Sequence, residues 1–183
     1  MKEKIVLFPV IILIVLFITV AVTRGQDVKI VFIRHGEKSA NGDNLSCQGI
    51  NRSLLLPAVL FKKFGMPDHI YVPAVKPGEV TKHMRMLQTI TPFAAKYDLT
   101  INSDFDVDDV NGIGKTLIRQ KGTQLVIWEH QELPAILKIL GVDEKLKWAD
   151  NDFDSIWIVT YKKGELIFSR DTENLRPSAG CSF

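Results

Sequence analysis

The sequence predicts an α/β fold: a three-layer sandwich with a mainly parallel central sheet, closed by a C-terminal hairpin. Short apolar segments rich in β-branched residues alternate with segments whose apolar residues recur at helical spacing. This alternation favours parallel strands that are connected by helices packed on the sheet. With 183 residues, 46% of them hydrophobic, the chain can build one globular domain with its own core.

The first 25 residues differ from the rest of the chain. Residues 5–22 carry no charge, and Lys2 and Lys4 precede them. Such a segment predicts either a secretory signal peptide or a membrane anchor, and the pattern leaves both open. The lysines predict that this end stays in the cytoplasm. The domain at residues 26–183 is therefore expected outside the cytoplasm, in the periplasm or tethered to the membrane.

Charge argues against a nucleic-acid partner. The formal net charge is +2, and residues 1–25 alone account for it, so residues 26–183 are formally neutral. A surface that binds nucleic acid needs clustered Lys and Arg, and no such stripe is present. The two cysteines, Cys47 and Cys181, fit one disulfide or two free thiols equally well.

The domain begins with a buried strand that ends in charged residues. Residues 28–33 are apolar apart from Lys29 and mostly β-branched, as in a strand buried on both faces. Arg34, His35 and Gly36 follow directly. Ligands bind at the carboxyl ends of strands in open α/β sheets, so this position predicts a functional site.

The other elements follow from the same patterns. After a loop at residues 39–44, Ser46 is placed to cap a helix. The turn Lys163-Gly164 joins the last two strands into an antiparallel hairpin, and polar coil is expected after Arg170. Further strands are expected at 69–72, 99–102, 125–128, 155–160 and 165–168, and helices at 54–64, 81–97, 110–121 and 135–140.

Three segments together resemble the histidine phosphatase superfamily, which also contains the phosphoglycerate mutases. They are RHGE at 34–37 after the first strand, the R-x-x-Q-T pattern at 85–89 in a helix, and His130 after a later strand. The resemblance covers residues 28–170. It implies a small phosphorylated substrate and chemistry without a metal or cofactor. The sequence contains no H-E-x-x-H motif and no Cys/His cluster with ligand spacing.

The resemblance implies a role for each basic side chain. His35 would attack phosphorus and form a phosphohistidine, with its other ring nitrogen hydrogen-bonded to a backbone carbonyl. Arg34, Arg85 and His130 would bind the phosphate oxygens and stabilise the transition state. Asn41, six residues after His35, matches a phosphate-contacting Asn of the mutase branch, and an ordinary loop residue fits this position equally well.

The resemblance also implies an acid that protonates the leaving group. Relatives commonly carry an acidic residue, typically Glu, about two dozen positions after the second arginine. Asp109 lies at that separation from Arg85 and is the first choice, while Asp106 and Asp108 stay open. Relatives often have a small residue before the second histidine, whereas this chain has Glu129.

Three functions remain open. The first is an exported, metal-independent phosphomonoesterase, and the second is a mutase-like phosphotransferase that uses the same pocket. The third is a non-catalytic, membrane-tethered module that binds phosphorylated ligands. The export segment disfavours a mutase, because glycolytic substrates are cytosolic. The presence of two histidines and two arginines disfavours the binding module.

Overall fold

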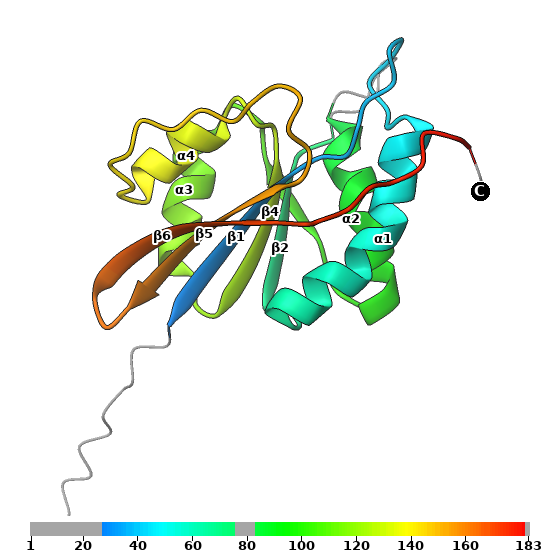
Figure 1. Ribbon diagram of the computed structural model, residues 1–183. Helices are drawn as coiled ribbons and strands as arrows, with labels where there is room; N and C mark the ends of the chain where they lie inside the picture. The colour runs from blue at the N-terminus through cyan, green and yellow to red at the C-terminus, as the bar shows by residue number, and fades with distance from the viewer. Residues whose placement is uncertain (1–26, 76–82, 182–183) are drawn as a thin grey trace, which may run out of the picture.

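The predicted α/β sandwich is confirmed by the computed structural model, which describes residues 27–75 and 83–181 (Figure 1). Six strands form one sheet in the order β3-β2-β4-β1-β5-β6. The first four in that order run parallel, and the β5–β6 hairpin adds two antiparallel strands. The elements are β1 (Val28–Arg34), α1 (Cys47–Phe64), β2 (His69–Pro73), α2 (Met84–Tyr97), β3 (Asn102–Phe105), α3 (Val110–Arg119), β4 (Thr123–Trp128), α4 (Leu133–Ile139), β5 (Ser155–Lys162) and β6 (Glu165–Thr172).

Helices cover both faces of the sheet, so the core has two halves. α1 and α2 pack on one face, and α3 and α4 pack on the other (Figure 1). Residues of β1 alternate between them: Ile30 and Phe32 belong to the α3/α4 half, and Val31 and Ile33 to the α1/α2 half. This two-sided burial explains why the strand is a continuous apolar run in the sequence.

The strand expected at residues 99–102 is wrong in position, because β3 runs from Asn102 to Phe105. Leu99 and Ile101 pack against the α1/α2 half of the core before the strand begins. β3 is an edge strand of mostly polar residues, so hydrophobicity does not mark it. The last strand also extends past Arg170, to Thr172, where coil was expected.

The buried face of α1 differs from the apolar spacing in the sequence. Leu54 and Leu55 belong to the apolar spacing of the helix expected at residues 54–64, but they are 54% and 46% exposed. Leu56 and Leu60 are buried, on the same face as Gly49. This face is partly made of small and polar residues, so hydrophobicity alone does not reveal it.

The predicted export segment lies outside the described residues. Within residues 27–75 and 83–181, no helix is long and apolar enough to cross a membrane.

The C-terminal tail returns to the start of α1 (Figure 1). Cys47 and Cys181, whose pairing the sequence left open, form a disulfide with 4.9 Å between their Cα atoms. The Asn51 side-chain amide donates hydrogen bonds to the carbonyls of Ser178 and Gly180, at 2.9 and 2.8 Å. These contacts hold the tail against α1, next to the turn that follows β1.

That turn touches α1 backbone to backbone. The Ser46 hydroxyl caps α1 by accepting a hydrogen bond from the Gly49 N–H at 3.2 Å, and it donates to the Glu37 carbonyl at 3.1 Å. A Cβ atom on Gly49 would lie 2.2 Å from the Glu37 carbonyl oxygen. A Cβ on Gly36 would lie 3.0 Å from the Gly49 carbonyl oxygen. Only glycine fits at position 49 without moving the turn.

We therefore expect Gly49→Ala to destabilise the protein. The added methyl group pushes against backbone, and overpacking of this kind costs about 1–3 kcal/mol in the free energy of unfolding. Gly180→Ala is the matched control, because its Cβ would meet nothing closer than the Ser178 hydroxyl at 3.5 Å. Urea unfolding of both variants measures the difference, and equal stability would contradict the close approach.

Candidate active site

Two parallel strands bring the predicted histidines to one edge of the sheet. β1 and β4 are neighbours, and Arg34 pairs with Trp128 in their register. The residues that follow, His35 on one strand and Glu129 and His130 on the other, therefore emerge together at the carboxyl edge. The charges of Arg85, Arg34 and His130 all act on the His35 ring. The structure thus brings together the four basic residues that the sequence singled out.

The R-x-x-Q-T segment fixes α2 to the loop after β1. The Gly36 N–H donates to the Thr89 hydroxyl at 2.9 Å, and the Leu45 N–H donates to the Gln88 side-chain oxygen at 3.0 Å. The Thr89 hydroxyl in turn donates to the Arg85 carbonyl at 2.7 Å. These bonds place the first turn of α2, and with it Arg85, beside the His35 turn.

Arg34 is held by a distant segment of chain. Its Nη1 donates to the carbonyl oxygens of Ala149, Asp150 and Asp152 at 3.2, 2.7 and 3.2 Å. Its Cζ atom lies 4.1 Å from the centre of the Phe153 ring, within range of a cation–π interaction. Burial lowers the pKa of Arg34, with partial compensation from nearby carboxylates. The residues between α4 and β5 therefore fix the direction of this guanidinium.

Arg85 and His130 are each held by one of their nitrogen atoms. Arg85 Nη1 donates to the Asp43 carbonyl at 3.2 Å. His130 Nε2 lies 3.0 Å from Asp150 Oδ1. This hydrogen bond is the main reason why the pKa of the Asp150 carboxyl lies below its ordinary value. Asp150 therefore contacts both Arg34, through its carbonyl, and His130, through its side chain.

Three buried polar atoms of this site have no hydrogen-bond partner in the described part of the chain: Arg34 Nε, Arg85 Nε and His130 Nδ1. A buried donor left unsatisfied costs about 1–3 kcal/mol, so such atoms need an explanation. In guanidinium groups, neighbouring N–H donors form a planar fork that matches phosphate and carboxylate oxygens. The unsatisfied Nε–H groups of Arg34 and Arg85 are therefore donors of the kind expected in an anion-binding site.

His35 has the hydrogen bond that a nucleophilic imidazole needs. Its Nδ1 lies 2.7 Å from the Gly36 carbonyl oxygen, which can only accept, so Nδ1 carries the proton. Nε2 then keeps its lone pair. Burial lowers the pKa of His35 to about 3, and the positive charges of Arg85 and Arg34 act in the same direction. The ring is therefore neutral at neutral pH.

The other two predicted site residues lie elsewhere in the fold. Asp109 caps α3: its Oδ1 accepts a hydrogen bond from the Gly112 N–H at 2.9 Å, and its side chain is exposed. Asn41 is exposed on the loop between the bridged residues Lys38 and Leu45. Within the described residues, neither side chain is bonded to the four basic residues. The catalytic role predicted for Asp109 remains a prediction.

Glu129, like Asp150 and Asp43, has a carboxylate that lies beside these basic residues. Its Oε1 lies 3.8 Å from Arg85 Nη2, and its Oε2 lies 3.8 Å from His83 Nδ1. The side chain is 24% exposed. In the sequence, Glu129 stands out only as a departure from relatives, which often have a small residue at this position. Its position directly after a buried strand was the available signal.

A buried ion-pair network supports the turn after Gly36. Arg52 of α1 bonds to Glu37 Oε1 at 2.8 Å and to Glu173 Oε2 at 2.5 Å, and Asp154 Oδ1 lies 3.5 Å away. Burial opposes the charge on Arg52, but the ion pairs outweigh it and raise its pKa. Burial raises the pKa of Glu173 to about 8. The network ties β1, α1 and the C-terminal tail together behind the site.

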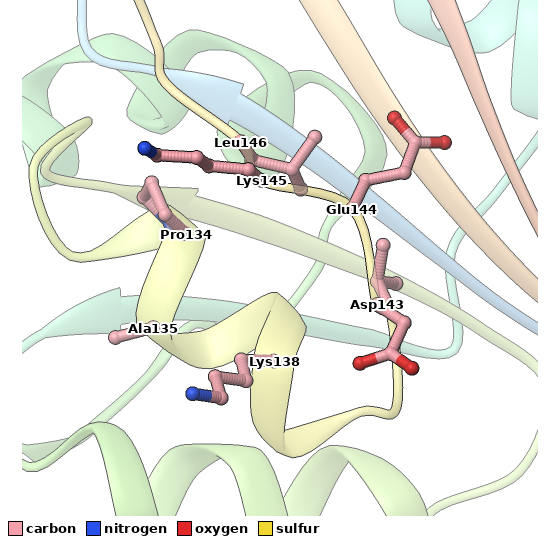
Figure 2. A pocket seen from close by; sticks show the side chains of 8 residues that line it. Pro134, Ala135, Lys138, Asp143, Glu144, Lys145 and Leu146 are labelled. Carbon is pink, nitrogen blue, oxygen red and sulfur yellow. The ribbon is translucent and has the colours of Figure 1, made fainter.

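The surface next to His130 is hollowed. A pocket of about 290 Å³ is lined by His130, Trp148 and Asp150, among others. It shares Pro134 and Leu146 with a larger pocket of about 420 Å³, where lysine and acidic side chains stand around α4 (Figure 2). The larger pocket contains none of the four basic residues. The smaller pocket includes one of them, His130.

The architecture is that of the phosphatase and mutase fold that the sequence resembled. A mycobacterial glucosyl-3-phosphoglycerate phosphatase with inorganic phosphate aligns with TM-score 0.55 and 13% identity, over 79% of this chain and 95% of that one. A phosphohistidine phosphatase SixA structure from Nakamurella multipartitia gives 0.52 and 15%, over 76% and 87%. An Entamoeba histolytica phosphoserine phosphatase variant in complex with phosphoserine gives 0.51 and 12%, over 80% and 96%. No family model and no curated protein matches the sequence.

The lowered pKa of His35 predicts a pH dependence of stability. Between pH 3 and the ordinary value of 6.5, the unfolded chain binds this proton and the folded chain does not. Stability therefore falls as the pH drops through this window, by at most about 1.4 kcal/mol per pH unit from this group. We expect the stability advantage of the wild type over His35→Ala to shrink between pH 6.5 and pH 4.

Urea unfolding at several pH values measures this difference. His69→Ala is the matched control. His69 lies at the amino end of β2, whereas His35 follows the carboxyl end of β1. A wild-type advantage over His35→Ala that stays constant with pH would show that His35 is not held neutral.

Proposed function

We propose that this chain is an exported, metal-independent phosphomonoesterase that acts through a phosphohistidine at His35. The observation that carries the proposal is the pairing of a neutral imidazole with two guanidinium groups whose buried Nε atoms have no hydrogen-bond partner among residues 27–75 and 83–181. A phosphate monoester is the anion that would use both features, since it needs charge neutralisation before a nucleophile can approach. The solved structures with this fold that bear phosphatase names support the proposal.

The reaction has two steps. Arg34 and Arg85 hold the phosphate oxygens, and His35 Nε2 attacks phosphorus while the bond to the leaving oxygen breaks. Water then attacks the phosphohistidine and releases inorganic phosphate with neutral His35. His130 stabilises the charge of the transition state. Its hydrogen bond to Asp150, with 3.0 Å between Nε2 and Oδ1, would orient the ring for this role.

The disulfide supports export. Disulfides persist in oxidising compartments and are rare in the cytosol. The Cys47–Cys181 bond thus agrees with the uncharged segment at residues 5–22, which the sequence analysis interprets as a signal or anchor. Outside the cytoplasm the substrates would be phosphorylated metabolites, glycolipids or proteins rather than glycolytic intermediates.

We expect His35→Ala to abolish phosphate ester hydrolysis, because it removes the nucleophile. The wild type, quenched during turnover of 4-nitrophenyl phosphate, should carry an acid-labile phosphate that mass spectrometry assigns to His35. His69→Ala, at the far end of β2, should retain both signals. Near wild-type turnover of His35→Ala would contradict the assignment. Transfer of the phosphate to an added alcohol rather than to water would identify a phosphotransferase instead.

Location can be tested separately. A reporter that is active only in the cytoplasm, fused after Phe183 of the full chain, should give no signal if the domain is exported. The same fusion without residues 1–25 should be active, which controls for folding of the reporter. A bright full-length fusion would contradict export and leave the proposed chemistry untouched.

A further inference from the structure

We propose that Glu129 is the acid that protonates the leaving group and then the base that activates water. This inference rests on the proposed phosphatase function. It assigns a catalytic role to a residue that the sequence resemblance did not mark, in place of the aspartates at 106, 108 and 109.

Glu129 lies at the same edge of the sheet as the proposed nucleophile, His35. The register pairs Arg34 with Trp128, so the residues one step beyond, His35 and Glu129, emerge side by side from β1 and β4. A group that protonates the leaving oxygen must reach the same phosphate ester that the nucleophile attacks. Glu129 starts from the correct edge of the sheet, in the strand next to the nucleophile.

The Glu129 carboxylate lies close to two basic side chains. The two carboxylate oxygens of Glu129 lie 3.8 Å from Arg85 Nη2 and 3.8 Å from His83 Nδ1. Both distances are too long for hydrogen bonds, so the carboxyl lies near these side chains without being locked to them. With a side chain that is 24% exposed, it can exchange protons with water.

Asp109, the acid chosen from the sequence, already has a structural role. The Asp109 carboxylate accepts the Gly112 N–H bond that caps α3, and it is exposed to solvent. For Asp109 to act, this cap would have to open or the substrate would have to extend to α3. Glu129 needs no such change, because it lies beside Arg85 already.

The Glu129 carboxyl gives up one proton in the first step and regains one in the second. In the first step, His35 Nε2 forms the N–P bond, the P–O ester bond breaks, and the departing oxygen takes the proton of the Glu129 carboxyl. In the second step, the Glu129 carboxylate takes a proton from water as the water oxygen bonds to phosphorus. The N–P bond then breaks, phosphate leaves, and both side chains return to their starting forms.

Two basic side chains near the Glu129 carboxylate belong to the proposed phosphate site. Arg85 Nη2 lies 3.8 Å away, and Arg34 of β1 interacts electrostatically with Glu129. A phosphate ester held by these two arginines would therefore lie beside the Glu129 carboxyl.

The test compares leaving groups in the full-length protein. Glu129→Gln keeps the shape of the side chain and removes its proton. We expect kcat/KM for glycerol 2-phosphate to fall about 100- to 10,000-fold, because an alkoxide needs a proton to leave. We expect kcat/KM for 4-nitrophenyl phosphate to change less than about tenfold, because nitrophenolate leaves without one. Glu132→Gln, the same change three residues away, is the matched control.

Each other outcome overturns the inference. Equal losses for both esters would show that Glu129 only positions Arg85. The leaving-group split in Asp109→Asn but not in Glu129→Gln would assign the acid to Asp109, since Asn preserves the helix cap. If the wild type hydrolysed neither ester, the phosphatase proposal itself would fail. Thermal unfolding of every variant separates these results from loss of the fold.

Discussion

The site depends on the parallel pairing of β1 with β4. Because Arg34 pairs with Trp128, the chain segments after both strands meet at the same height on the carboxyl edge. A shift of register by one residue would turn every side chain of one strand to the other face. The two apolar clusters prevent such a shift, since Ile30 and Phe32 belong to one half and Val31 and Ile33 to the other. Packing of the core thus determines where His35 and His130 lie.

Burial of the basic residues is unfavourable in free energy, and contacts from other parts of the chain offset part of this cost. Burial disfavours the charge on Arg34, and three backbone carbonyls and the Phe153 ring compensate for part of this. Those groups come from the segment between α4 and β5, which has no regular structure. Behind the site, Arg52 joins Glu37 to Glu173. Segments far apart in the sequence therefore hold the edge of the sheet in place.

Candidate site residues could be predicted from the sequence where a residue pattern coincides with the end of a predicted strand. Arg34, His35 and His130 were singled out because each follows or ends a buried strand and matches the family pattern, and the parallel sheet brings such strand ends together. β3 was misplaced because its edge position allows polar residues at Asn102, Ser103 and Asp104. The disulfide could not be inferred because the distance between its cysteines depends on the whole fold.

The two candidate acids, Asp109 and Glu129, also differ in whether sequence pattern and position in the fold agree. Asp109 was chosen because of the number of residues that separate it from Arg85. Separation along the sequence does not say where a side chain lies in the fold or what it contacts. In the structure its carboxylate caps a helix, a common role for Asp at this position. The Glu129 carboxylate lies 3.8 Å from Arg85, one of the two arginines that would hold the phosphate. On this proposal the guanidinium that recognises phosphate also keeps the acid beside the leaving group, which links recognition of phosphate to its hydrolysis.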